Sequence, residues 1–213
     1  MKNNTTELVC VLDRSGSMSG LESDTIGGFN SLIAKQKRED GACFVSTVLF
    51  DTECNVLHDR VPIEKISQMT ASDYVPGGCT ALLDALGRAI HHIGNTHKYA
   101  REEDVPEHTI FVITTDGLEN ASKRYTSAKV KRMIERQKNR YGWEFIFLAA
   151  NIDAVETAEH IGISRTRAAN YRADGEGTAS MFSVMSKAVS AVRCREELSE
   201  DWASDLERDA KRN

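Results

Sequence analysis

Short apolar runs alternate with longer amphipathic segments along most of this chain. Residues 8–12 form the first run and contain no polar side chain, which is typical of a parallel strand buried on both faces of a sheet. Residues 21–33 then repeat apolar side chains at the spacing of one helix face. This alternation indicates βαβ units, so the chain is predicted to fold as an α/β domain with a doubly wound, mostly parallel sheet and helices on both faces.

The same patterns set the order of the predicted elements. Turn residues at 51–53 join two strand-like runs as a hairpin, which makes the second run an antiparallel edge strand. Residues 1–195 are assigned to this one domain, and residues 196–213 to a polar, acidic tail that is partly helical. Strands are predicted over residues 8–12, 44–50, 54–61, 109–114, 144–150 and 168–171, and helices over 20–39, 80–93, 127–140, 154–161 and 177–195.

Composition argues against several classes of protein. The chain has 213 residues, 40% of them hydrophobic, which is enough to bury a sizeable core. Its five cysteines are scattered and never form a Cys-x-x-Cys motif, which argues against a disulfide framework and a zinc ribbon. No apolar run reaches the ~18 residues of a membrane helix, and the polar N-terminus lacks the features of a signal peptide, so a cytoplasmic location is expected. The net charge of −5 gives no reason to expect nucleic-acid binding, and a monomer is expected.

Oxygen-bearing side chains follow predicted strands or open the helix after them. Asp13, Ser15 and Ser17 alternate directly after the first strand, Thr80 follows a pair of glycines, and Asp116 ends a later strand. The carboxyl ends of parallel strands meet at one edge of an open sheet, where ligands bind. Carboxylate and hydroxyl oxygens suit a hard divalent cation such as Mg²⁺ better than histidine or thiolate ligands would. The sequence therefore predicts a metal site at this edge.

These segments resemble the metal-ion-dependent adhesion site of von Willebrand factor A-type domains, a fold shared with the inserted domain of integrins. The resemblance covers most of the chain and looks most like stand-alone bacterial or phage members of the family. It implies that Mg²⁺ is held directly by Ser15, Ser17 and either Thr80 or Asp116, while the remaining aspartates act largely through water; Mn²⁺ or Ca²⁺ could take its place. It also implies that a partner protein supplies an Asp or Glu carboxylate as the last ligand. All five positions of the family site are filled, by Asp13, Ser15, Ser17, Thr80 and Asp116.

The expected function is binding rather than turnover. A first shell rich in hydroxyls leaves much of the positive charge of the ion unneutralised, so a carboxylate from outside is attracted to it. The leading hypothesis is a non-enzymatic, Mg²⁺-dependent protein-interaction domain. The alternative is a Mg²⁺-dependent phosphoester hydrolase, because such enzymes also place an aspartate after the first strand, but Ser15 stands where one class needs a second aspartate for acid/base work. A third possibility is a structural protein whose metal only ties loops together.

The segment that follows the first strand, residues 13–17, allows two interpretations besides a metal site. Residues 13–17 taken alone could form a strand-to-helix turn whose Asp and Ser side chains cap a helix. A calcium-binding loop would use Asp13, Ser15, Ser17 and Asp24. However, Met18 stands where that loop needs glycine, and a strand rather than a helix precedes it.

Three residues near the predicted donors each allow two roles. Asp84 and Glu119 are either supporting acceptors for the site or ordinary acids of a helix start and a loop. Cys79, next to Thr80, could be redox-sensitive, but it is expected to be a small buried side chain.

Charge is unevenly distributed along the chain. Residues 123–140 contain eight Lys or Arg residues and one Glu. The solvated face of an outer helix explains this composition; the alternative is a docking surface for an acidic partner or for the acidic tail. In the tail, Leu198, Trp202 and Leu206 share one helical face, which could pack on the domain or engage another protein.

Overall fold

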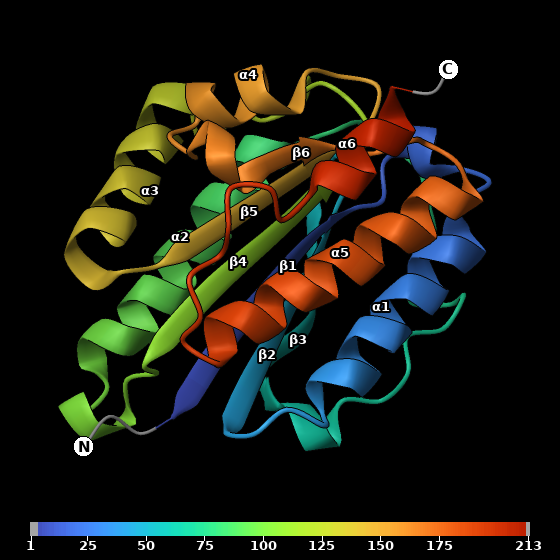
Figure 1. The fold of residues 1–213 in the computed structure, drawn as a ribbon. Helices are drawn as coiled ribbons and strands as arrows, with labels where there is room; N and C mark the ends of the chain where they lie inside the picture. The colour runs from blue at the N-terminus through green and yellow to red at the C-terminus, as the bar shows by residue number, and fades with distance from the viewer. Residues whose placement is uncertain (1–3, 212–213) are drawn as a thin grey trace.

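Strand β1 (Thr5–Asp13) lies inside a six-stranded sheet in the computed structural model, which describes residues 4–211 (Figure 1). The other strands are β2 (Ala42–Phe50), β3 (Cys54–Pro62), β4 (His108–Thr115), β5 (Glu144–Ala149) and β6 (Ala168–Asn170). The strand order is β3-β2-β1-β4-β5-β6. All neighbours pair in parallel except β2 and β3, which are antiparallel. The pairing confirms the predicted α/β class and its antiparallel edge strand.

Helices cover both faces of the sheet. They are α1 (Glu22–Gln36), α2 (Leu82–Tyr99), α3 (Ser127–Tyr141), α4 (Ala154–His160), α5 (Gly175–Arg193) and α6 (Ser204–Ala210). Figure 1 shows α1, α5 and α6 in front of the sheet, with α2 behind it. In the described range 4–211, no helix is both long and apolar enough to cross a bilayer.

The two helical layers produce two separate cores. Because side chains alternate along a strand, Leu8, Cys10 and Leu12 of β1 face the core under α1 and α5. Val9 and Val11 face the opposite core, which α2, α3 and α4 close. The central strands are therefore apolar on both faces, which is why they read as continuous apolar runs in the sequence.

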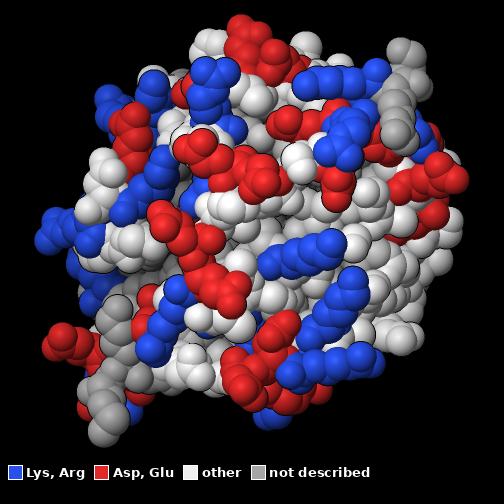
Figure 2. All heavy atoms as spheres, in the orientation of Figure 1, with Lys and Arg blue, Asp and Glu red and all other residues white. Residues whose placement is uncertain are grey.

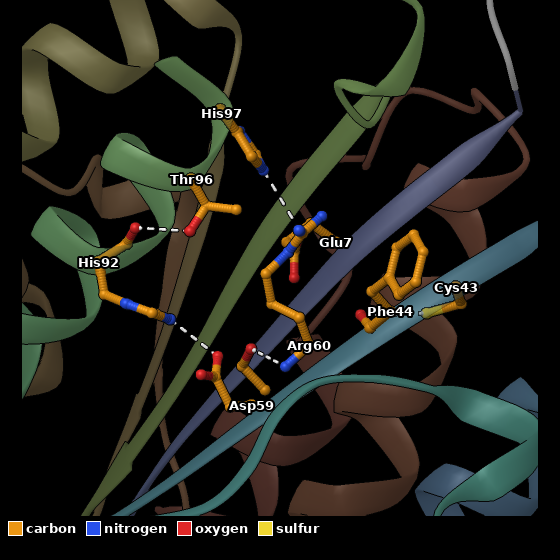
Figure 3. Close-up of polar contacts among 9 residues, drawn as sticks. Glu7, Cys43, Phe44, Asp59, Arg60, His92, Thr96 and His97 are labelled. Atoms are coloured by element: carbon orange, nitrogen blue, oxygen red, sulfur yellow. Dashed lines mark hydrogen bonds and ion pairs between the residues drawn. The ribbon is translucent and has the colours of Figure 1, made fainter. Parts of the chain in front are cut away.

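Strand β1 begins earlier than the apolar run predicts, because three polar residues at its start are buried. Glu7 is fully buried beneath α2, and its Oε2 accepts a hydrogen bond from Arg60 Nε at 2.7 Å. His97 Nε2 lies 3.3 Å from the same oxygen (Figure 3). Arg60 and His97 therefore come from β3 and α2 to partner this carboxylate, a tertiary arrangement that strand periodicity does not reveal.

The segment after residue 195 packs against the rest of the fold. It contains α6, which contacts α5 and β6. Leu206 is fully buried, and with Leu198 it joins the core under α1 and α5. Trp202 Nε1 donates a hydrogen bond to the carbonyl oxygen of Thr166 at 3.0 Å. The apolar face predicted for this segment thus packs on the domain.

Candidate metal centre

The predicted donors gather where β1 and β4 end side by side. These strands pair in parallel up to Leu12 and Thr114, so Asp13 and Thr115 end them at the same sheet edge. The chain leaves β1 toward β2 on one side and later returns through β4 on the other. This is the point in an open α/β sheet where the loops diverge and leave room for a ligand.

Two neighbouring groups hold the carboxylate of Asp13 in one orientation, and a third bonds its backbone carbonyl. Its Oδ1 accepts a hydrogen bond from the backbone N–H of Ser15 at 2.7 Å, and its Oδ2 accepts one from Thr115 Oγ1 at 2.6 Å. The hydroxyl of Tyr74 donates to the backbone carbonyl of Asp13. Sequence reasoning missed Thr115 and Tyr74. The polar pair Thr114–Thr115 in an otherwise apolar strand was the one signal that could have indicated Thr115.

Ser15, Ser17 and Asp116 form a continuous chain of contacts next to Asp13. Ser17 Oγ donates to Asp116 Oδ1 at 2.6 Å and lies 3.2 Å from Ser15 Oγ. A short 3-10 turn over Gly16–Met18 places both hydroxyls on the same side. Asp116 and Ser15 are buried, with 3% and 2% exposure, whereas Ser17 is exposed, so the cluster meets solvent at Ser17.

Thr80 reaches the same place from the loop before α2. A Cβ atom built on Gly117 would lie 3.7 Å from Thr80 Oγ1 and 3.8 Å from Ser17 Oγ, so the two hydroxyls flank this glycine. The backbone of Thr80 exchanges two hydrogen bonds with Asn120: Thr80 N–H donates to Asn120 Oδ1 at 2.9 Å, and Asn120 N–H donates to the Thr80 carbonyl at 3.0 Å. The structure therefore brings all five predicted residues together.

The loops that carry the donors are bonded directly to one another. Gly16 N–H donates to the carbonyl of Gly78 at 3.1 Å, and Gly77 N–H donates to the carbonyl of Arg14 at 2.9 Å. Gly78 has φ of +70°, a left-handed conformation that favours glycine, and this explains the glycine pair before Thr80. Arg14 also pairs with Asp51 at 2.9 Å, which ties in the end of β2.

Burial makes the site unfavourable for negative charge when no cation is bound. Loss of solvent raises the pKa of Asp13, although hydrogen bonds from Thr115 and Ser15 oppose this rise, and the nearby charge of Asp116 adds to it. Loss of solvent likewise raises the pKa of Asp116 against its hydrogen bond from Ser17. A bound cation would favour both carboxylates in their ionised form.

The donor set fits a hard cation. Two carboxylates and three hydroxyls converge, and these are the oxygen ligands that Mg²⁺ and Mn²⁺ accept. In the part of the chain that the structure describes, no group of three His, Cys, Asp or Glu side chains is placed to hold a metal ion, so a metal centre built on acids, imidazoles or thiols alone is not present there.

The residues around the donors position loops. Asp84 accepts backbone N–H bonds from residues 123, 124 and 125; burial disfavours its charge, but these bonds outweigh it and lower the pKa of Asp84. Glu119 similarly accepts from the N–H groups of Leu83, Ala121 and Ser122. Cys79 is exposed, so the expectation that it is buried was wrong. Its N–H donates to Thr52 Oγ1, which holds the backbone there and turns the thiol outward.

Comparison with known proteins identifies the fold through structure. No protein-family model matches the chain, and no curated protein matches it significantly. Similar solved structures include a von Willebrand factor type A protein from Catenulispora acidiphila, with 14% identity and a TM-score of 0.60 over 87% of this chain and 43% of that one. The von Willebrand factor domain of the pilus tip protein Mfa5 from Porphyromonas gingivalis has 13% identity and a TM-score of 0.62, over 92% of this chain and 98% of that domain.

A third similar structure contains a metal. Proximal thread matrix protein 1 from the mussel byssus, with zinc in its MIDAS motif, has 12% identity and a TM-score of 0.58 over 87% of this chain and 46% of that one. The chain thus spans less than half the length of the Catenulispora and byssus proteins. At these identities the likeness shows the fold: the chain has the architecture of von Willebrand factor A domains.

Proposed function

We propose that this chain, whose fold is that of a von Willebrand factor A domain, binds a partner protein through a divalent metal ion. The observation that carries the proposal is the convergence of five oxygen donors from three loops. Contacts of 2.6 to 3.2 Å connect Asp13 to Ser15 and Thr115, and Ser17 to Ser15 and Asp116. The fifth donor, Thr80, lies with Ser17 beside Gly117. Metal in the matching motif of the byssus protein supports it. The proposed ion is Mg²⁺, with Mn²⁺ or Ca²⁺ as substitutes.

Each donor has a distinct proposed role. Ser15, Ser17 and Thr80 are hydroxyl ligands, while Asp13 and Asp116 supply negative charge and orient water. Hydroxyl ligands withdraw little of the charge of the ion, so it keeps a strong affinity for an anionic oxygen. A partner carboxylate, from Asp or Glu, is therefore the proposed final ligand. Binding would last as long as the metal stays, which makes partner capture sensitive to chelators.

Calorimetric titration tests the metal site directly. Mg²⁺ or Mn²⁺ added at neutral pH should bind at one site in the wild-type protein, and Asp13→Ala should abolish the signal. Asp24→Asn is the matched control, because Asp24 lies in the first turn of α1 outside the cluster yet would be a ligand in a calcium-binding loop. Wild-type protein without a binding signal, or Asp13→Ala binding as well as wild type, would refute the proposed site.

A second experiment tests the carboxylate. Water proton relaxation in the Mn²⁺-loaded protein reports the water molecules on the metal. Added acetate should lower this relaxation as a carboxylate displaces water, and added acetamide, which has the same size but no charge, should not. Equal effects of acetate and acetamide would contradict the carboxylate preference while leaving the metal site intact.

We propose no enzymatic activity for this site. The position that needs an acid/base group in the phosphoester-hydrolase alternative holds Ser15, whose hydroxyl cannot perform that role at neutral pH. Generic phosphoesters incubated with the protein and Mg²⁺ should remain intact. Hydrolysis that disappears in Asp13→Asn would favour the enzyme instead.

A further inference from the structure

A groove of 760 Å³ lies between α2 and α3, on the face of the sheet opposite α1 and α5. It extends from Tyr125, just before α3, to Pro106, just before β4. Three cations line it: Lys98 from α2, and Lys129 and Arg136 from α3. Among the described residues that line the groove, none is Asp or Glu. The groove is thus positively charged in a chain whose net charge is −5.

The cations of the groove have no acidic partner among the described residues. Within residues 4–211 no ion pair joins Lys98, Lys129 or Arg136 to a carboxylate, and the same holds for the other Lys and Arg residues of 123–140. Figure 2 shows Lys and Arg side chains gathered along the edge where Figure 1 places α3. By contrast, Arg172, which lies just after β6, pairs with three acids. The unneutralised charge on α3 is therefore available to an anionic partner.

The walls of the groove are apolar between these charges. Ile90, Val105 and Met133 line it together with the rings of Trp143 and Tyr141. Trp143 is 5% exposed and stacks on Phe111, and Lys129 Nζ lies 4.1 Å from the ring centre of Tyr125. The faces of these two rings are covered, so among the described aromatic residues of the groove only Tyr141, at 50% exposure, is open, and one ring does not form the series of stacking platforms that single-stranded nucleic acid uses. Apolar side chains of a peptide fit such walls better.

The tail of the chain does not fill this groove. Residues 196–211 pack through Leu198 and Leu206 into the core under α1 and α5, on the other face of the sheet. The sequence explained the basic helix as a solvated outer face, with a docking surface for an acidic partner or for the acidic tail as the alternative. Because the described part of the tail lies on the other face of the sheet, a partner is the remaining docking candidate. We propose that the α2–α3 groove binds an acidic peptide segment of a partner protein, with apolar side chains inserted between its carboxylates.

Fluorescence anisotropy with a defined probe tests this docking site. The probe is a fluorescein-labelled peptide of glutamates interrupted by leucines at helical spacing, measured against the full chain in chelator so that its carboxylates cannot use a metal. The peptide should bind, and K129E/R136E should weaken binding at least about tenfold at low salt. The matched control is R124E/R132E, which makes the same change in charge on the same segment outside the groove and should weaken binding about twofold or less.

Three further probes sharpen the result. A peptide of glutamates alone should bind more weakly than the leucine-containing one, because it leaves the apolar walls unfilled. A lysine-leucine peptide and a single-stranded oligothymidine should not bind. Equal losses in the two double variants, equal binding of the two glutamate peptides, binding of the oligonucleotide, or no binding of the probe would each overturn the proposal. Because metal is absent throughout, failure here leaves the proposed metal-dependent function untouched.

Discussion

Asp13 and Asp116 are buried carboxylates whose negative charge destabilises the protein when no cation is bound. Both are nearly buried, and loss of solvent raises the pKa of each carboxyl. Hydrogen bonds from Thr115, Ser15 and Ser17 recover part of that cost. The ionised form of both carboxylates therefore opposes folding unless a cation, as proposed, is bound beside them.

The metal-free protein should lose stability as pH rises. A raised pKa means that the folded state keeps a proton that the unfolded chain has released, so the free energy of unfolding falls from about pH 4 upward through the raised values. Asp116→Asn removes one of these charges and should flatten the decline, whereas Asp24→Asn should not. Urea unfolding in chelator across pH 4 to 8 measures this, and identical pH profiles for wild type and Asp116→Asn would contradict it.

Glu7 is a third buried carboxylate, and Arg60 is its main partner. Arg60→Met should destabilise the fold by about 3 kcal/mol, because it leaves a fully buried charge whose Oε1 has no hydrogen-bond partner within residues 4–211 (Figure 3). Arg101→Met is the control, since its pairs with Glu103 and Asp104 are exposed and should matter little. Chemical denaturation compares the variants. Equal midpoints for Arg60→Met and wild type would show that the carboxylate is satisfied by other means.

Helix α1 contains two adjacent glycines in very different surroundings. A Cβ atom on Gly28 would lie 2.1 Å from Phe182 Cδ2 of α5, whereas a Cβ on Gly27 would meet nothing within 4 Å. The missing side chain at Gly28 thus allows α1 and α5 to approach closely over the sheet. Gly27 has no such role and only weakens the helix.

Alanine substitutions should separate these two effects. Gly27→Ala should stabilise the protein by about 0.5–1 kcal/mol through helix propensity. Gly28→Ala should destabilise it by about 1–2 kcal/mol, because overpacking against Phe182 exceeds the same gain in propensity. Thermal unfolding of the pair provides an internal control, since both changes add one methyl group to one helix. A stabilised Gly28→Ala would mean that α1 and α5 pack less closely than the structure shows.

At the level of elements, the sequence predicts the strands and helices that have a periodic pattern of apolar residues. Every strand and helix from β1 to α5 follows from an apolar run or a helical repeat, and the antiparallel edge strand follows from the turn at 51–53. Features that depend on long-range contacts were not predicted, such as Glu7 in β1, whose buried carboxylate meets Arg60 and His97. Asp13, Ser15 and Ser17 could be predicted from their spacing in the sequence. Tyr74 and Thr115 could not, because they reach Asp13 only through tertiary contacts. The groove between α2 and α3 likewise requires the packing of both helices.

On the scale of the whole molecule, a bound metal should stabilise the fold. The loops that carry the donors are tied together by bonds between Gly16 and Gly78 and between Gly77 and Arg14, so an ion that binds them favours the folded state. Mg²⁺ at about 100 times its dissociation constant should add about 2.7 kcal/mol, which for this size raises Tm by roughly 5–10 °C. Calorimetric scans with Mg²⁺, compared with NaCl of equal ionic strength, measure this. A shift that persists in Asp13→Ala would place the ion elsewhere.

Both edges of the sheet are poorly suited to recruit another strand. Strand β6 has only three residues, and α6 packs on it. Beside it, the indole N–H of Trp202 donates a hydrogen bond to the carbonyl oxygen of Thr166. At the opposite edge, β3 has two shifts of register against β2, a left-handed residue at Arg60, and a proline at its end. Such irregular or covered margins suppress backbone-mediated self-association. Recognition of another molecule by this fold would therefore depend on side chains rather than on an open sheet edge.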